Sequence, residues 1–166
     1  MKYTAIFLTI ILAVAGSAFA QTTPPDTSVT AAAQGSYPAG TAFDGILLSG
    51  FTIGNGVIIH GDGSGAEGHA GLSLIGPALP TGGQQVINVD VLINGGSSSA
   101  ANVATVTGTA TVDLGNGTAP LTGVPVVLTI AANPSDGSGT VGIVLGATTL
   151  PTASINDGTM AVAPMQ

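Results

Sequence analysis

Residue types that could do chemistry are concentrated in one ten-residue window of the sequence, HGDGSGAEGH. It contains both histidines of the chain, His60 and His69, its one glutamate, Glu67, and Asp62. If the central Ser-Gly pair forms a two-residue hairpin turn, the two histidines lie opposite each other, and so do the two carboxylates. Opposed side chains on one face of a hairpin have Cβ atoms about 5 Å apart. Two imidazoles and two carboxylates at this spacing could bind Zn²⁺ or Cu²⁺.

The same window also has interpretations without a transition metal. Its four glycines favour a solvent-exposed loop in which the polar side chains are simply hydrated. Asp62 and Glu67 could be the carboxylate pair of a glycosidase, and together with Asp136 they could bind Ca²⁺. The glycosidase lacks aromatic side chains to stack on a sugar, and the Ca²⁺ site has too few oxygens. We therefore expect no catalytic residues and no obligatory cofactor.

A second candidate site is a row of threonines at alternate positions, Thr105, Thr107, Thr109 and Thr111. On a strand these four hydroxyls share one face. Evenly spaced hydroxyls could bind a repetitive surface such as ice or a crystalline polysaccharide. Threonine is also favoured on the exposed face of any strand, so an ordinary hydrated face is the alternative.

The elements that would position these residues are strands. In residues 101–114 apolar or small side chains occupy the face opposite the threonines, and residues 85–93 and 122–131 alternate in the same way. Period-two alternation is typical of a strand with one buried and one exposed face. No segment repeats apolar residues at helical spacing. The sequence predicts an all-β, antiparallel β-sandwich of eight or nine strands, of Ig-like or jelly-roll kind, with a closed β-barrel as the alternative.

Turn dipeptides separate most of the expected strands. Asn-Gly and Asp-Gly pairs favour the positive φ values of hairpin turns. Asp157-Gly158 is the clearest two-residue turn, whereas Asp44-Gly45 falls inside an apolar run and suggests a bulge. Pro125 has no N–H to donate to a ladder and is expected at an edge or bulge. The segments with strand character are residues 43–53, 57–62, 67–75, 85–93, 102–114, 123–131, 140–145, 148–155 and 159–163.

The N-terminus has the features of a secretory signal peptide. Lys2 precedes an apolar run over residues 5–16 that is too short to span a bilayer, and Ala-Phe-Ala at 18–20 offers a cleavage site. We expect a signal peptide over residues 1–20 and a flexible Thr/Pro/Ala-rich leader over 21–40, with a short strand near 28–33. A single β-domain then covers residues 41–166. The protein is expected to be secreted, or periplasmic in a Gram-negative host.

Charge limits the class of partner. The chain has eight acidic residues and one basic residue, so removal of Lys2 with the signal changes the net charge from −7 to −8. Without Lys or Arg, the mature protein has no counter-charge for phosphates, which argues against nucleic acids, nucleotides and anionic membranes. The chain has no cysteine, so stability must come from burial and backbone pairing and not from disulfides.

Together these features predict a secreted, non-catalytic structural or surface-interaction domain of the matrix, adhesion or self-assembly type. Residues 122–131, with Val127 outward, could pair edge to edge with a second copy. The alternatives are a divalent-metal protein or metalloenzyme built on the histidine–carboxylate window, and an ice- or crystal-binding protein built on the threonine row. Asn116 begins the one usable glycosylation sequon, which matters only in a eukaryotic host.

Overall fold

The computed structural model describes residues 23–78 and 83–166, and this part of the chain is all-β, without a helix. The signal peptide predicted over residues 1–20 lies outside the described residues. Nothing in the described part forms a helix long and apolar enough to cross a membrane. The strands are β1 (Thr27–Ser36), β2 (Ala42–Phe43), β3 (Ile46–Leu47), β4 (Gly50–Ile59), β5 (Ala66–Ala78), β6 (Gln84–Ala100), β7 (Val103–Asp113), β8 (Leu121–Ala132), β9 (Gly139–Leu145), β10 (Thr148–Thr149) and β11 (Ala153–Pro164).

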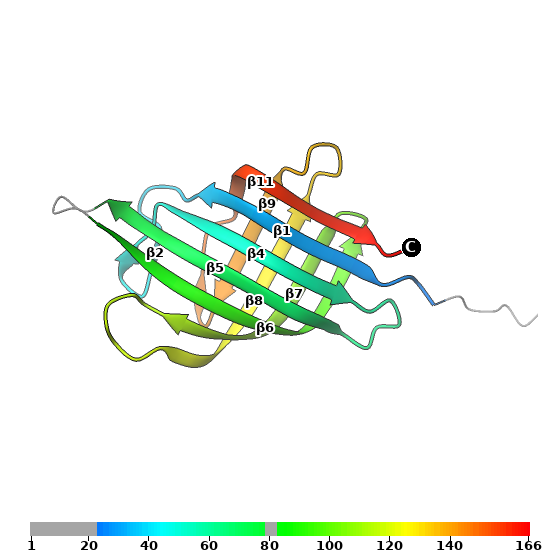
Figure 1. Cartoon of the computed structure of the whole chain (residues 1–166), viewed down its shortest axis with the longest axis horizontal. Coiled ribbons are helices and arrows are strands. Elements are labelled where there is room, and N and C mark those ends of the chain that lie inside the picture. Colours follow the sequence, from blue (N-terminus) through cyan, green and yellow to red (C-terminus); the bar gives the residue numbers. More distant parts are fainter. Residues whose placement is uncertain (1–22, 79–82) are drawn as a thin grey trace, which may run out of the picture.

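Nine of these strands form one antiparallel sheet in the order β10-β9-β11-β1-β4-β5-β6-β7-β8, and β2 pairs with β3 separately. β8 also pairs with β9, from Val126 opposite Leu145 to Ala132 opposite Gly139, so the pairing leads from β9 through the sheet and back to β9. The β9–β11 ladder is limited to two residue pairs. Figure 1 shows β1, β4 and β5 side by side in a front layer, with β8 and β9 behind them.

The buried face of the sheet follows the alternation expected from the sequence. Successive residues of a strand point to opposite faces, and over much of each long strand every second residue enters one continuous apolar core. The inner faces predicted for residues 85–93 and 101–114 are therefore confirmed. Buried residues of these segments are Ile87, Val89, Val91, Ile93, Ala104, Val106, Ala110, Val112 and Leu114.

The aromatic side chains of the described residues lie inside. Tyr37, Phe43 and Phe51 are all buried, and the rings of Tyr37 and Phe51 pack with their centroids 5.3 Å apart. Burial raises the pKa of the Tyr37 hydroxyl. The outer surface of the described chain therefore has no aromatic side chain with which to stack on a ligand.

Two of the turn assignments are wrong: the expected bulge is a turn, and the expected turn is a bulge. Asp44 (φ 49°) and Gly45 (φ 78°) form the two-residue turn between β2 and β3, where the sequence suggested a bulge. These are the positive φ values that a tight hairpin requires. Asp157-Gly158 lies inside β11 and not in a turn. There β11 stays paired with β1 while the register shifts beside it, so the positive φ of Gly158 belongs to a bulge.

The flexible leader expected over residues 21–40 is wrong for the ten residues of β1. Thr27–Ser36 is β1, which pairs with β11 on one side and β4 on the other. The short strand expected near residues 28–33 is confirmed. Val29, Ala31 and Ala33 are buried, so the Thr- and Ala-rich composition contains a period-two alternation built from small side chains.

The edge-to-edge pairing expected for residues 122–131 is also wrong for most of that segment. β8 pairs with β7 on one side and, from Val126 onward, with β9 on the other. Its backbone groups there are already paired, which leaves none for a second copy. Pro125 lies just before the β9 ladder begins, where its missing N–H leaves no gap in that ladder.

The assignment of inner and outer faces can be tested with two leucines. Leu128 is fully buried in β8, whereas Leu92 on β6 is 54% exposed. Leu128→Ala should lower the free energy of unfolding by about 2–5 kcal/mol, because it removes buried methyl groups and leaves a cavity. Leu92→Ala should change it by less than about 0.5 kcal/mol. Urea unfolding followed by circular dichroism measures both, and equal losses would contradict the assignment.

Candidate functional site

The hairpin that carries the histidine–carboxylate window does not have the predicted turn. β4 and β5 are joined by residues 60–65, and the His60 N–H donates to the Gly65 carbonyl at 2.9 Å. The register then places His69 opposite Gly56 and not opposite His60. The two-residue turn at the Ser-Gly pair is wrong because glycines of this window adopt positive φ in a longer loop.

Each histidine instead faces an aspartate from another part of the chain. His60 Nδ1 lies 3.5 Å from Asp26 Oδ2, and the second oxygen of Asp26 accepts the Gly61 N–H at 2.8 Å. His69 Nδ1 lies 3.4 Å from Asp90 Oδ1, with side chains that are 67% and 75% exposed. The first pair joins the start of β1 to the β4–β5 loop, and the second lies on the outer face of the sheet.

The carboxylates of the window are not brought together. Asp62 Oδ1 accepts the Ser64 N–H at 2.9 Å, and hydrogen bonds from the Ser64 side chain and backbone lower the pKa of this carboxyl. Glu67 is exposed on β5. Asp136, the third residue of the Ca²⁺ alternative, accepts from Ser138 in the β8–β9 loop. Across residues 23–78 and 83–166, no three His, Asp or Glu side chains are placed to hold a metal ion. The arrangement expected to bind Zn²⁺ or Cu²⁺ is not formed.

The threonine row of β7 lies on the outer face, where three of its members are exposed and Thr105 is half-buried. The neighbouring strands do not widen it evenly into a threonine array. Thr109, for example, lies between Leu92 of β6 and Pro125 of β8. Binding of ice or a crystalline polysaccharide by this row stays a prediction.

The most distinctive feature of the outer face is a strip without large side chains, which we call the trough. Its floor consists of Ala32 on β1, Gly54 and Gly56 on β4, and Gly71 on β5, all of them exposed. Ala32 pairs with Gly54, and Gly54 pairs with Gly71, so the strip runs across three adjacent strands. Gly56 extends the floor along β4.

Neither backbone geometry nor packing requires glycine at the three glycine positions of the floor. Gly54, Gly56 and Gly71 are not among the residues with positive φ. A Cβ at Gly54 or Gly56 would have no neighbour within 4 Å, and at Gly71 it would meet only the Gly54 carbonyl oxygen, at 4.0 Å. At Gly68 and Gly108, in contrast, a Cβ would overlap a carbonyl of the adjacent strand. Glycine inside a strand is destabilising, and often marks a place where a ligand or another backbone approaches closely.

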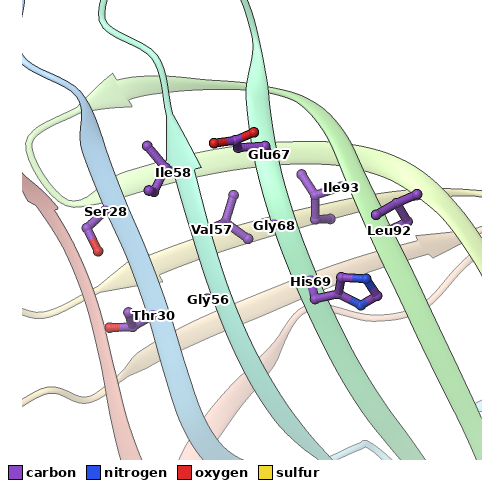
Figure 2. A pocket seen from close by; sticks show the side chains of 10 residues that line it. All are labelled: Ser28, Thr30, Gly56, Val57, Ile58, Glu67, Gly68, His69, Leu92 and Ile93. Atoms are coloured by element: carbon purple, nitrogen blue, oxygen red, sulfur yellow. The ribbon is translucent and has the colours of Figure 1, made fainter.

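The largest hollow of the trough, of about 600 Å³, lies over Gly56 and is lined by side chains from β1, β4, β5 and β6. Figure 2 shows its bare floor between Thr30 on one side and His69 on the other, with Glu67 at one end. Leu92, which is 54% exposed, lines it next to His69. The hollow therefore combines a backbone floor, an aliphatic side chain and a carboxylate.

Two smaller hollows continue the trough across the sheet. One of about 360 Å³ lies over Ala32 and Gly54, with Asp157 at its rim. The other, of about 300 Å³, lies over Gly71 and has Asp90 and Asp113 at its rim. Each of the three hollows thus has at least one carboxylate on its border.

The three hollows of the trough open on the outer face and are lined by one imidazole, that of His69. The His69 imidazole lies beside the Asp90 carboxylate, and both side chains are largely exposed. The interior is filled by apolar side chains. Buried polar atoms without a hydrogen-bond partner among the described residues, the Tyr37 hydroxyl and Asn55 Oδ1, lie on the inner side.

The floor glycines were missed by reasoning from the sequence. Gly54 and Gly56 share a strand face because they are two residues apart, a signal that is visible in FTIGNGVII. It was not recognised because Asn55-Gly56 resembles a turn. That Gly71 joins them depends on the β4–β5 register, which the sequence does not show directly.

Comparisons with protein-family models, with curated proteins and with solved structures find no significant match to this chain. Its function must therefore be inferred from its own residues.

Filling the trough should stabilise the protein. Gly54→Thr should raise the free energy of unfolding by about 0.5–1 kcal/mol, because threonine restricts the unfolded chain and suits an exposed strand. Gly108→Ala should lower it by about 1–3 kcal/mol, because its Cβ overlaps the Leu92 carbonyl. Thermal unfolding measures both, and a destabilised Gly54→Thr would mean that this glycine has a structural role.

The two His–Asp pairs should differ in their effect on stability. Asp26→Ala removes the acceptor of the Gly61 N–H and should cost about 1–2 kcal/mol, with faster amide exchange in residues 60–65. Asp90→Ala breaks an exposed pair and should cost less than about 1 kcal/mol. Hydrogen exchange read by mass spectrometry compares them. Unchanged exchange in the loop of Asp26→Ala would refute this role.

Proposed function

We propose that this protein is a secreted, non-catalytic interaction protein that contacts an extracellular partner through the trough. The observation that carries the proposal is the group of adjacent glycines, Gly54, Gly56 and Gly71, which neither φ nor packing requires. Three such residues side by side on one exposed face weaken two central strands. A close approach by a partner would account for them.

We further propose that the scaffold is a closed, flattened β-barrel and not a sandwich of two separate sheets. Support comes from the β8–β9 ladder together with the two residue pairs between β9 and β11. Closure removes edges that would otherwise pair with other chains. The scaffold would then display its outer face while most of the strand backbones remain paired among themselves.

Non-catalytic binding is favoured over a metalloenzyme by the positions of the histidines. Each pairs with one aspartate, and the two pairs belong to different parts of the molecule. Secretion is proposed from the sequence of residues 1–20, which has the features of a signal peptide. Purification of the protein from the culture medium with Gln21 at its N-terminus would support both the export and the cleavage site.

The trough can be tested by filling it. Labelled protein is added to the cells that produce it and to their extracellular matrix, and the retained fraction is measured. Gly54→Thr/Gly71→Thr should lose most of the retention while remaining folded. Gly142→Ala on β9, where the new Cβ makes ordinary contacts of 3.6 Å and 3.7 Å with Thr129 and Thr152, should retain it. Equal retention of the two variants, or none by the unmodified protein, would overturn the proposal.

A further inference from the structure

We infer that the partner of the trough is a basic, extended peptide segment, whose lysine or arginine side chains lie over the glycine floor and end at the carboxylates of the rim. The inference rests on the proposed function, because it names the class of partner for the same surface. It begins from the distribution of charge over the molecule.

Acidic side chains are concentrated around the trough. Four of the eight acidic residues of the chain border its three hollows. In contrast, β8, β9 and β10 contain no Asp or Glu, and the hollow of about 250 Å³ on that side is lined by hydroxyls and aliphatic groups. The acidic residues at the trough are Glu67, Asp90, Asp113 and Asp157.

These carboxylates have almost no counter-charge within the protein. The described residues include no Lys or Arg, and His69 is the one basic side chain that lines the trough. Glu67, Asp90 and Asp157 are exposed, so a partner can reach them. A cationic partner would supply the missing charge and would relieve repulsion among the carboxylates.

The dimensions of the trough suit an extended chain. Asp157 on β11 and Asp90 on β6 lie four strand spacings apart, or about 19 Å at about 4.8 Å per spacing. An extended peptide advances about 3.3 Å per residue, so roughly six residues would cross the floor. Because Gly54 and Gly71 have no side chains, the peptide backbone can lie close to the sheet.

The apolar part of the rim favours a peptide over a neutral polysaccharide. Leu92 and the half-buried Ile58 line the largest hollow, and the methylene stems of Lys or Arg pack well on such groups while the charge reaches a carboxylate. Sugar rings usually stack on aromatic side chains, and those of the described residues are all buried.

The test uses fluorescein-labelled octalysine as the probe and fluorescence anisotropy at low ionic strength as the measurement. Asp90→Asn/Asp157→Asn removes two charges at the trough. Asp44→Asn/Asp62→Asn removes the same number elsewhere, and asparagine tolerates the positive φ of Asp44. The trough pair should weaken binding about tenfold and the control pair less than about twofold. Binding should also weaken as salt is added.

A second variant separates the shape of the trough from its charge. Gly54→Thr/Gly71→Thr keeps every carboxylate but blocks the floor, and should weaken octalysine binding about tenfold. Full binding by this variant would overturn the inference, because the peptide would then be held by charge alone. Equal weakening by the two charge pairs, or no binding by the unmodified protein, would overturn it as well.

A soluble β-glucan tested in parallel distinguishes this failure from failure of the proposed function. Glucan binding that is lost on blocking the floor, without octalysine binding, would reject the basic peptide and leave the trough as the interaction surface. If neither octalysine nor glucan binds, and blocking the floor leaves retention by cells and matrix unchanged, both proposals are wrong.

Discussion

The structure depends on an apolar inner face whose central strands, β1 and β4 to β7, are paired on both sides by backbone hydrogen bonds. The chain has no cysteine, and the described residues have no Lys or Arg, so neither disulfides nor lysine and arginine ion pairs hold the strands together. Inward valines, isoleucines and leucines are buried almost completely, and this burial is the main source of stability. The β8–β9 ladder matters in the same way, because it pairs backbone groups that would otherwise form an open edge.

A scaffold stabilised from within leaves its outer face free to vary. Outward positions of the central strands contribute little apolar burial, so glycine there costs only the entropy of ordering a flexible residue. The fold can carry Gly54, Gly56 and Gly71 together, whereas comparable losses on the inner face would leave cavities. A local loss of strand stability of this kind is typical of surfaces where function and stability compete.

Strand content and the inner face could be predicted from the sequence because period-two alternation is a local property. The inner face of residues 85–93 consists of isoleucine and valine, and that of residues 101–114 includes two valines and a leucine, and both buried faces are predicted correctly. β1 was assigned to a leader because its alternation uses alanine in place of larger residues. Turns were less predictable, since an Asp-Gly pair supplies positive φ both to a hairpin, as at Asp44 and Gly45, and to a bulge, as at Gly158.

The predicted metal cluster and the observed trough require different registers of β4 against β5. A two-residue turn at the Ser-Gly pair would place Gly54 opposite Ile75 and Gly71 opposite Ile58, whereas the observed register pairs Gly54 with Gly71. The two registers differ by an even number of residues, so both keep the same side chains inside, and burial alone does not choose between them. The loop over residues 60–65 stabilises the observed register. In it the His60 N–H donates to the Gly65 carbonyl, and the Gly61 N–H donates to the Asp26 carboxylate. The interactions that separate the histidines thus also bring the glycines together.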